Sequence, residues 1–299
     1  MELERKKTSR QWLTYAAAMV SVICWAANMP ATRFIMQFYG FGSLALFRFA
    51  VAAMLLCAIA AVRRTKLPKI KDIPKFAVAG LFGIFLFTTF VNIGATFVYA
   101  GIASFIVNSS PVFTLIMAWV ILKEKVKPAC WIGILISFCG LIGVMLAQAA
   151  EFSFNIGLLL LLIPSISNGV YTVVQRKLYK SYSFFEATTF SLIAGTVFFL
   201  FFIPDLARDL TSEAIPWQMH IFAFILGVFP AAVAFLTWGY ALAKVEKTAH
   251  ITAFMYLIPF IATLIGFLWM GETLSFWTFL GGAVIIGGMI LTNTLGKSK

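Results

Sequence analysis

The chain is dominated by apolar runs of about 20 residues, separated by short segments that carry most of its charge. A helix of that length crosses a hydrocarbon layer of about 30 Å. Of the 299 residues, 62% are hydrophobic and 11% are charged, and the mean hydropathy is +0.96. A soluble domain carries about 25% charged residues and has too little interior to hide so much apolar surface. The sequence therefore predicts an all-α integral membrane protein, with the lipid bilayer as part of its solvent.

Ten runs satisfy this length requirement, and we expect each to form a transmembrane helix. The first five lie near residues 13–36, 43–62, 76–98, 101–122 and 129–148. The second five lie near residues 155–175, 184–203, 220–241, 248–270 and 275–295. The first run is too long for the core of a secretory signal peptide and lacks a small-residue cleavage pattern, so we expect it to be a retained span.

The basic residues orient these ten helices. If the N-terminus is cytoplasmic, 20 of the 23 Lys and Arg residues fall on the cytoplasmic side. The exceptions are Arg33 and Arg208, on the outer side, and Arg48, within the second span. An acidic loop at residues 205–213 also faces outward. The positive-inside rule therefore predicts a multi-pass protein of the cell membrane, inner or plasma, with cytoplasmic N- and C-termini.

Several classes of protein do not fit this chain. Its net charge of +12 lies in short clusters that flank the spans, so we expect no nucleic acid as a partner. We find no metal-ligand spacing, P-loop, nucleophile elbow or H-E-x-x-H motif, and therefore expect no metal, no cofactor, no catalytic residues and no enzyme. The cysteines lie singly inside apolar runs, which is typical of small packing residues; they are Cys24, Cys57, Cys130 and Cys139.

The two halves of the chain repeat each other. Pro111, Glu124, Gly133 and Gly140 have counterparts exactly 148 residues later, at Pro259, Glu272, Gly281 and Gly288. Ser21, Trp25, Asn28 and Thr32 align at an offset of 143 with Pro164, Asn168, Tyr171 and Gln175. Both of these latter sets keep to one helical face. We therefore predict two repeats, residues 1–148 and 149–299.

Each repeat would hold five helices, an odd number, so the second repeat must be inserted upside down. Inverted repeats are typical of secondary transporters, in which access alternates around a site near the membrane midplane. A duplicated membrane protein that transports nothing is the alternative.

Polar residues inside these spans should face protein or a cavity, because an unpaired polar group in hydrocarbon is costly. They form stripes on helices from both repeats, which predicts one shared substrate cavity. The opposing interpretation is that the Asn and Thr side chains only join helices to one another. The candidate cavity residues are Trp25, Asn28, Asn92, Tyr99, Asn108, Asn168, Tyr171, Trp238, Thr252 and Tyr256.

Two prolines and a few ionisable residues complete the candidates. Pro111 and Pro259 interrupt equivalent spans, so we interpret them as hinges for gating, with ordinary tolerated prolines as the alternative. His250 near the inner end of its span is a candidate for proton coupling, although a lone histidine there is more often structural. Arg48 lies about one turn inside its span, from where we expect it to snorkel to the headgroups.

These features together resemble a known family. A late-helix proline, an apolar run ending in Leu122-Lys123-Glu124 or Met270-Gly271-Glu272, and a glycine-rich span occur twice. This arrangement resembles the drug/metabolite transporter superfamily, specifically its EamA-type ten-helix exporters. Trp25 to Pro30 and Arg48 look like family features too. One departure is Lys123, which stands where the second repeat has a glycine.

The resemblance implies a central cavity, alternating access, and export of amino acids or related metabolites. Export of drugs or nucleobase-like metabolites is the alternative within this class. A membrane receptor or a membrane protein that does not transport is the alternative outside it. The expected partners are a small-molecule substrate and the bilayer, and a homodimer is left open.

Overall fold

The fold was taken from a computed structural model, which describes residues 2–97, 100–146, 156–270 and 276–294. All regular elements in these ranges are helices, so the all-α prediction is confirmed. Those before residue 150 are α1 (Glu2–Ile35), α2 (Phe41–Val62), η1 (Ile70–Asp72), α3 (Ile73–Gly80), η2 (Leu81–Leu86), α4 (Phe87–Gly94), α5 (Ala100–Val107), α6 (Ser110–Ile121) and α7 (Pro128–Leu146). Those after it are α8 (Ile156–Leu178), α9 (Phe184–Val197), η3 (Leu200–Phe202), α10 (Ile203–Thr211), α11 (Trp217–Leu226), η4 (Gly227–Val233), α12 (Ala234–Lys244), α13 (Ala249–Thr252), η5 (Ala253–Tyr256), α14 (Leu257–Met270) and α15 (Phe276–Thr294).

Five stretches are long and apolar enough to cross a membrane unbroken, within the ranges described. They are residues 11–32, 41–62, 70–94, 156–178 and 217–244. A sixth, formed by α9 with the helical segment that follows it, passes the same test but is bent by 50°. Four shorter apolar helices lie at residues 105–121, 128–143, 249–265 and 279–294. Large apolar side chains such as Leu268, Trp12 and Phe276 are exposed on the outside of the bundle, as expected where lipid replaces water.

Two predicted spans are interrupted, at positions that correspond in the repeat. The span near 101–122 breaks at a turn after Val107, and a new helix, α6, starts at Ser110. The span near 248–270 passes through the 3-10 segment η5 before α14 starts at Leu257. Pro111 and Pro259 each lie in the first turn of the helix that follows the break. There a missing N–H costs little, because the first N–H groups of a helix have no intrahelical partner. Both prolines therefore lie where a helix begins, and their role as hinges for gating stays a prediction.

The segment after α9 also differs from expectation. Residues 205–213 were predicted as an acidic loop, but most of them lie in the amphipathic helix α10. Pro204 lies in its first turn, and Asp205 lies 3.7 Å from Arg208 one turn later. A proline and an acidic residue in the first turn both favour helix initiation, a local signal that hydropathy alone does not register.

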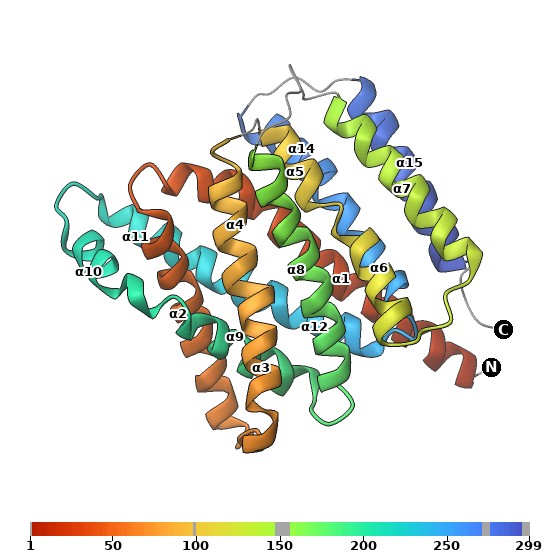
Figure 1. Ribbon diagram of the computed structural model, residues 1–299, viewed down its shortest axis with the longest axis horizontal. Coiled ribbons are helices and arrows are strands. Elements are labelled where there is room, and N and C mark those ends of the chain that lie inside the picture. Colours follow the sequence, from red (N-terminus) through yellow and green to blue (C-terminus); the bar gives the residue numbers. More distant parts are fainter. Residues whose placement is uncertain (1, 98–99, 147–155, 271–275, 295–299) are drawn as a thin grey trace.

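The helices α7 and α15 form an antiparallel pair along one side of the bundle (Figure 1). A Cβ added to Gly133 would lie 2.6 Å from the Gly288 carbonyl oxygen, and one added to Gly140 would lie 2.6 Å from that of Gly281. Between these contacts Ser137 Oγ donates to the Ile285 carbonyl at 3.1 Å. Small residues on both helices thus bring the two backbones into contact.

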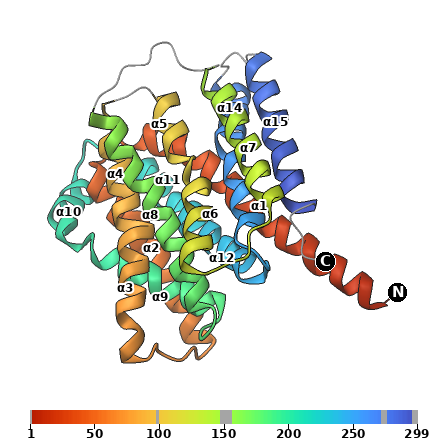
Figure 2. The ribbon, with the colours of Figure 1, turned by 45° about the vertical axis from the view of Figure 1, so that its right-hand side comes forward.

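The remaining helices interlock across the middle of the chain. α1 packs against α12 and α14, whereas α8 packs against α4 and α6. The turned view in Figure 2 shows α15 and α7 beside α14, with α8 and α6 in front of α1 and α12. Helices before and after residue 150 therefore contact each other throughout the bundle, and the polar side chains described next lie at these contacts.

Candidate functional site

The polar face of α1 is held by the second half of the chain. Ser21 Oγ lies 2.7 Å from Thr237 Oγ1 and donates to the Ala234 carbonyl at 3.0 Å. Trp25 Nε1 donates to the Pro230 carbonyl at 3.1 Å. Pro230 lies in η4, a π-helical turn, and such turns leave backbone groups available and are frequent at functional sites.

Aromatic rings pack against one another beside this polar face of α1. The ring centroids of Trp25 and Trp238 are 5.3 Å apart, so two of the predicted cavity residues are in contact. Phe235 packs edge-on against both Trp25 and Tyr171, at 5.6 and 6.0 Å. Rings from α1, α8 and α12 therefore meet at one place.

Arg48 lies next to this region and differs from expectation. It is 7% exposed and lies seven residues after the start of α2, roughly 10 Å along the helix axis. Its Nη2 donates to Asn28 Oδ1 at 2.7 Å and its Nη1 to Thr32 Oγ1 at 3.1 Å. The snorkelling prediction is wrong, because the side chain turns toward the polar face of α1 and bonds there.

A second polar group joins α8 to the break between α5 and α6. Asn168 Nδ2 donates to Ser110 Oγ at 3.3 Å and contacts the Met255 sulfur at 3.6 Å. Ser165 Oγ donates to the Ile106 carbonyl, which lies just before the break. Asn108, another predicted cavity residue, is buried within the turn itself. Ser165 of α8 thus adds hydrogen bonds to the backbone carbonyls at the break, and Asn168 binds the side chain that starts the next helix.

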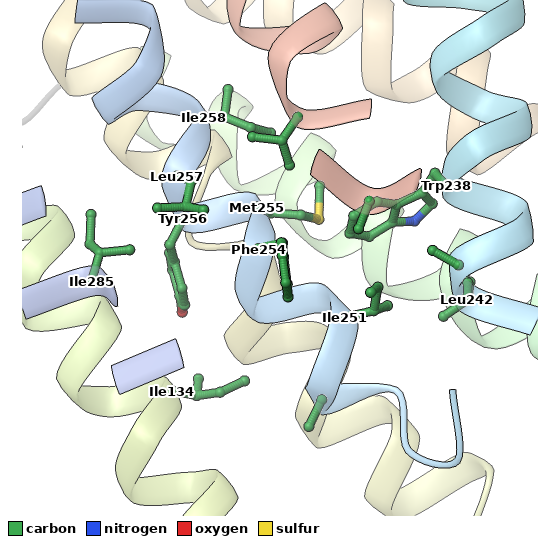
Figure 3. Close-up of a cluster of buried hydrophobic side chains, with 14 of the residues drawn as sticks. Ile134, Trp238, Leu242, Ile251, Phe254, Met255, Tyr256, Leu257, Ile258 and Ile285 are labelled. Atoms are coloured by element: carbon green, nitrogen blue, oxygen red, sulfur yellow. The ribbon is translucent and has the colours of Figure 1, made fainter. Parts of the chain in front are cut away.

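The other candidates are dispersed. Tyr256 is fully buried and points toward α7 and α15, near Ile134 and Ile285 (Figure 3). Thr252 Oγ1 donates to the Thr248 carbonyl of its own helix at 3.2 Å, and His250 is buried on the same short helix, α13. Asn92 is half-buried on α4. Tyr99 lies outside the described residues.

A third polar cluster, which we call the Arg176 lock, consists of Arg176, Glu124 and Thr248. Arg176 at the end of α8 lies 3.2 Å from Glu124 Oε1 and donates to the carbonyls of Leu242, Val245 and Glu246 at 2.8–3.0 Å. Glu124 accepts from Thr248 Oγ1 at 2.8 Å and from Thr248 N at 3.0 Å. The ends of α6, α8 and α12 and the start of α13 are thereby tied together.

Lys123 explains how the chain reaches this lock. It ends α6 with a φ of +54°, a left-handed conformation that glycine adopts most easily. The Glu124 N–H then bonds back to the Ala118 carbonyl at 3.2 Å. The departure from the repeat at Lys123 therefore keeps the backbone turn that a glycine would favour.

At the start of α2, a fourth polar cluster joins the turn after α1 to α10 and α11. The Tyr39 hydroxyl bonds to His220 Nδ1, and Ser43 Oγ donates to Asp209. Burial, and then the negative charge of Asp209, raise the pKa of Tyr39 to about 12, because both disfavour the phenolate.

The sequence drew attention to some of these residues but did not indicate the partners that they bind. Arg48 was expected to snorkel from about one turn inside its span, and Glu124 was noticed only as a marker of the repeat. The partners of Arg48 and Arg176 come from distant helices, so no local signal identifies them. Among the described residues, no three His, Cys, Asp or Glu side chains come together as metal ligands.

Comparison with known proteins places this architecture. The sequence profile of the EamA-like transporter family matches residues 12–146 and again residues 155–294. The uncharacterized transporter YdfC of Bacillus subtilis (strain 168) is 30% identical, with 96% of this chain and 92% of that protein covered. A probable terminal-alkyne amino-acid exporter of Streptantibioticus cattleyicolor is also 30% identical, with 95% of each chain covered.

A solved crystal structure shares the fold. It superimposes with a TM-score of 0.77 at 18% sequence identity and covers 97% of this chain and 98% of its own. Together with the two matches of the family profile, these relatives assign the chain as a transporter and not an enzyme. The chain belongs to the EamA-like transporter family, whose members are multi-pass proteins of the cell membrane.

Proposed function

We propose that the chain is a secondary carrier that exports amino acids or related small organic solutes. Transport would proceed by alternating access around a central cavity between two inverted five-helix repeats, residues 1–148 and 149–299. Both termini would be cytoplasmic. The amino-acid class is suggested by the Streptantibioticus relative, which is named as an exporter of a terminal-alkyne amino acid.

The helices of the bundle support ten spans. The five unbroken spans, the bent pair and the four shorter apolar helices each coincide with one predicted span. In Figure 1 the connections α2–α3, α6–α7, α8–α9 and α12–α13 lie toward the lower edge of the molecule, where α1 also begins. These connections, together with the helix ends that adjoin them, carry 14 of the 23 Lys and Arg residues, which supports a cytoplasmic lower edge.

Reciprocal contacts support the inverted repeat. A Cβ on Gly80 would meet the backbone of Ser191 and Gly195, whereas a Cβ on Gly227 would meet Arg48 and Val51. Ser191 follows Arg48 by 143 residues, so the same helix contact is made twice with the halves exchanged. The pairs Gly133–Gly288 and Gly140–Gly281 are exchanged in the same way at an offset of 148.

We base the carrier mechanism on one feature above all: buried polar contacts join opposite halves of the chain, one beside the break after Val107 and one at the π-helical turn η4. Asn168 reaches Ser110 at one break, and Trp25 reaches the carbonyl of Pro230 at a π-helical turn. Broken helices with available backbone near the midplane are the usual setting of substrate sites in secondary transporters. The predicted cavity residues on α1, α8 and α12 lie around these two contacts. We call this region the polar layer.

The Arg176 lock supplies a closed cytoplasmic end. It ties α6 of the first half to α8 and α13 of the second through one ion pair and several charge-assisted hydrogen bonds. Hydrogen bonds to charged groups contribute about 1.5–3 kcal/mol each. In this proposal the lock must open before solute enters from the cytoplasm.

The test is flux into proteoliposomes, measured for a panel of amino acids, nucleosides and drugs against protein-free vesicles. We expect uptake of amino acids and a marked decrease in Asn28→Ala, since Asn28 lies in the polar layer. A pH gradient that drives wild-type flux but not His250→Gln flux would support proton coupling through His250. No solute moving beyond the protein-free background would contradict the carrier proposal.

A further inference from the structure

Arg48 is a buried cation with no anionic partner among the residues that the structure describes. Its side chain is over nine-tenths buried, two turns inside α2. Lys75 pairs with Asp72, Arg176 with Glu124 and Arg208 with Asp205, whereas Arg48 has no ion-pair partner among the described residues. An arginine in the hydrocarbon region that no carboxylate neutralises requires an explanation.

Its donors are only partly used. A guanidinium has five N–H donors, and Arg48 donates from Nη1 and Nη2 to the neutral oxygens of Thr32 and Asn28. Thr32 also donates to Asn28 Oδ1 at 3.1 Å, which fixes the two acceptors relative to each other. The Nε–H has no partner among the described residues. The guanidinium is thus oriented by neutral groups and retains a free edge.

The energetic cost favours a function for this arrangement. Removing a charged group from water costs several kcal/mol even after relaxation, and an amide and a hydroxyl do not neutralise it. Ionisable groups inside membrane spans are rare and usually mark the path of a substrate or ion. The fork of N–H groups on a guanidinium binds a carboxylate in two-point geometry.

We propose that Arg48 binds the carboxylate of the transported solute, with Asn28 and Thr32 as positioning residues that hold the guanidinium ready. This inference rests on the proposed carrier function and specifies its substrate class as solutes with a free carboxylate. The Nε edge is enclosed in the present state, and the acid reaches it in the open state of the transport cycle. When the acid leaves, the oxygens of Asn28 and Thr32 remain as neutral partners.

The test compares each acid with its own carboxamide. Proteoliposomes with wild-type protein or Arg48→Gln are assayed with leucine, phenylalanine and propargylglycine and with the three corresponding amides. Losing a charge-assisted pair should lower the apparent affinity for the acids roughly 10- to 100-fold while the amides change less than about twofold. Arg208→Gln, on the exposed helix α10, is the matched control and should behave as wild type.

A second variant separates substrate binding from a merely structural link between α1 and α2. Asn28→Asp gives Arg48 a permanent internal carboxylate, so the link is kept or strengthened. If Arg48 binds substrate, Asn28→Asp should be at least as heat-stable as wild type but should lose acid transport. This variant also provides the test if Arg48→Gln does not fold.

Two results would overturn the inference. One is an Arg48→Gln protein that loses acids and amides equally; the other is an Asn28→Asp protein that transports acids normally. In either case Arg48 is a structural link, while the carrier function stands. Wild-type vesicles that move neither acids nor amides would contradict the proposed export of amino acids, and the inference with it.

Discussion

Tyr256 is a fully buried tyrosine whose hydroxyl has no hydrogen-bond partner among the described residues. Its ring fills the space between η5 and the α7–α15 pair, which accounts for its size but not for its hydroxyl. A buried, unsatisfied polar group costs about 1–3 kcal/mol. A phenylalanine would pack there without this cost, so retention of the hydroxyl favours a role in another state of the transporter.

We therefore predict opposite effects of Tyr256→Phe on stability and transport. Stability should rise by about 1–3 kcal/mol, because the unsatisfied hydroxyl is removed and the ring is kept. Flux should fall, because the group predicted to face the solute is lost. Thermal unfolding in detergent and flux in proteoliposomes measure the two. If stability rises and flux is unchanged, Tyr256 is a packing residue and leaves the list of cavity candidates.

At the scale of elements, the α7–α15 pair shows how small residues determine a helix contact. Gly133 and Gly140 meet glycines of the other helix in antiparallel order, whereas a Cβ on Gly287 would have nothing within 4 Å. Glycine repeats alone do not reveal this difference, because Gly287 and Gly288 are adjacent in the sequence. Only the rotation of α15 decides which of them faces α7.

The two kinds of position should respond oppositely to alanine. Gly133→Ala places a methyl group 2.6 Å from the Gly288 carbonyl oxygen, and such overpacking costs about 1–3 kcal/mol. Gly287→Ala should be neutral or stabilising by up to about 1 kcal/mol, because alanine favours helix over glycine. Thermal unfolding of both variants is the measurement. Equal destabilisation by the two would contradict the packing of α7 on α15.

At the scale of the whole molecule, the Arg176 lock joins residues 124, 176 and 248 at one end of the bundle. The polar layer and the cluster at Tyr39 and His220 lie deeper in the bundle and toward its other end. The alternating-access mechanism that we propose requires each end of the bundle to open in turn. The lock is thus a candidate determinant of which end is open at rest.

Breaking the lock should shift this equilibrium. In Arg176→Gln the ion pair and its charge-assisted bonds are lost, so we expect the ends of α6 and α12 to separate in a larger fraction of molecules. Spin labels at the exposed positions Lys125 and Lys244, in a background without native cysteines, report the distance distribution. Lys177→Gln, at the exposed residue directly after Arg176 in α8, is the control. Identical distributions in wild type and Arg176→Gln would show that the lock does not hold this end closed.

The helical character of the chain follows from the sequence itself. Hydropathy is a sum over neighbouring residues, so the apolar runs identify the helices without knowledge of their partners. The same local reasoning failed where a break or a short amphipathic helix depends on caps and turns, as after Val107 and in α10. Lys123 is a further case that local reasoning does not predict, since its positive φ does not follow from its side chain.

The connections within the candidate site were decided only by the tertiary structure. Arg48 was expected to reach the headgroups, but it turns inward to Asn28 and Thr32 of another helix. Glu124 was visible as a repeated residue, yet its contacts with Arg176 and Thr248 depend on how α6, α8 and α13 are rotated and shifted. Apolar length places a residue in the membrane, whereas helix rotation and depth decide what it touches. That is why the sequence by itself determined the helices and the family, and the packing determined the partner of each buried charge.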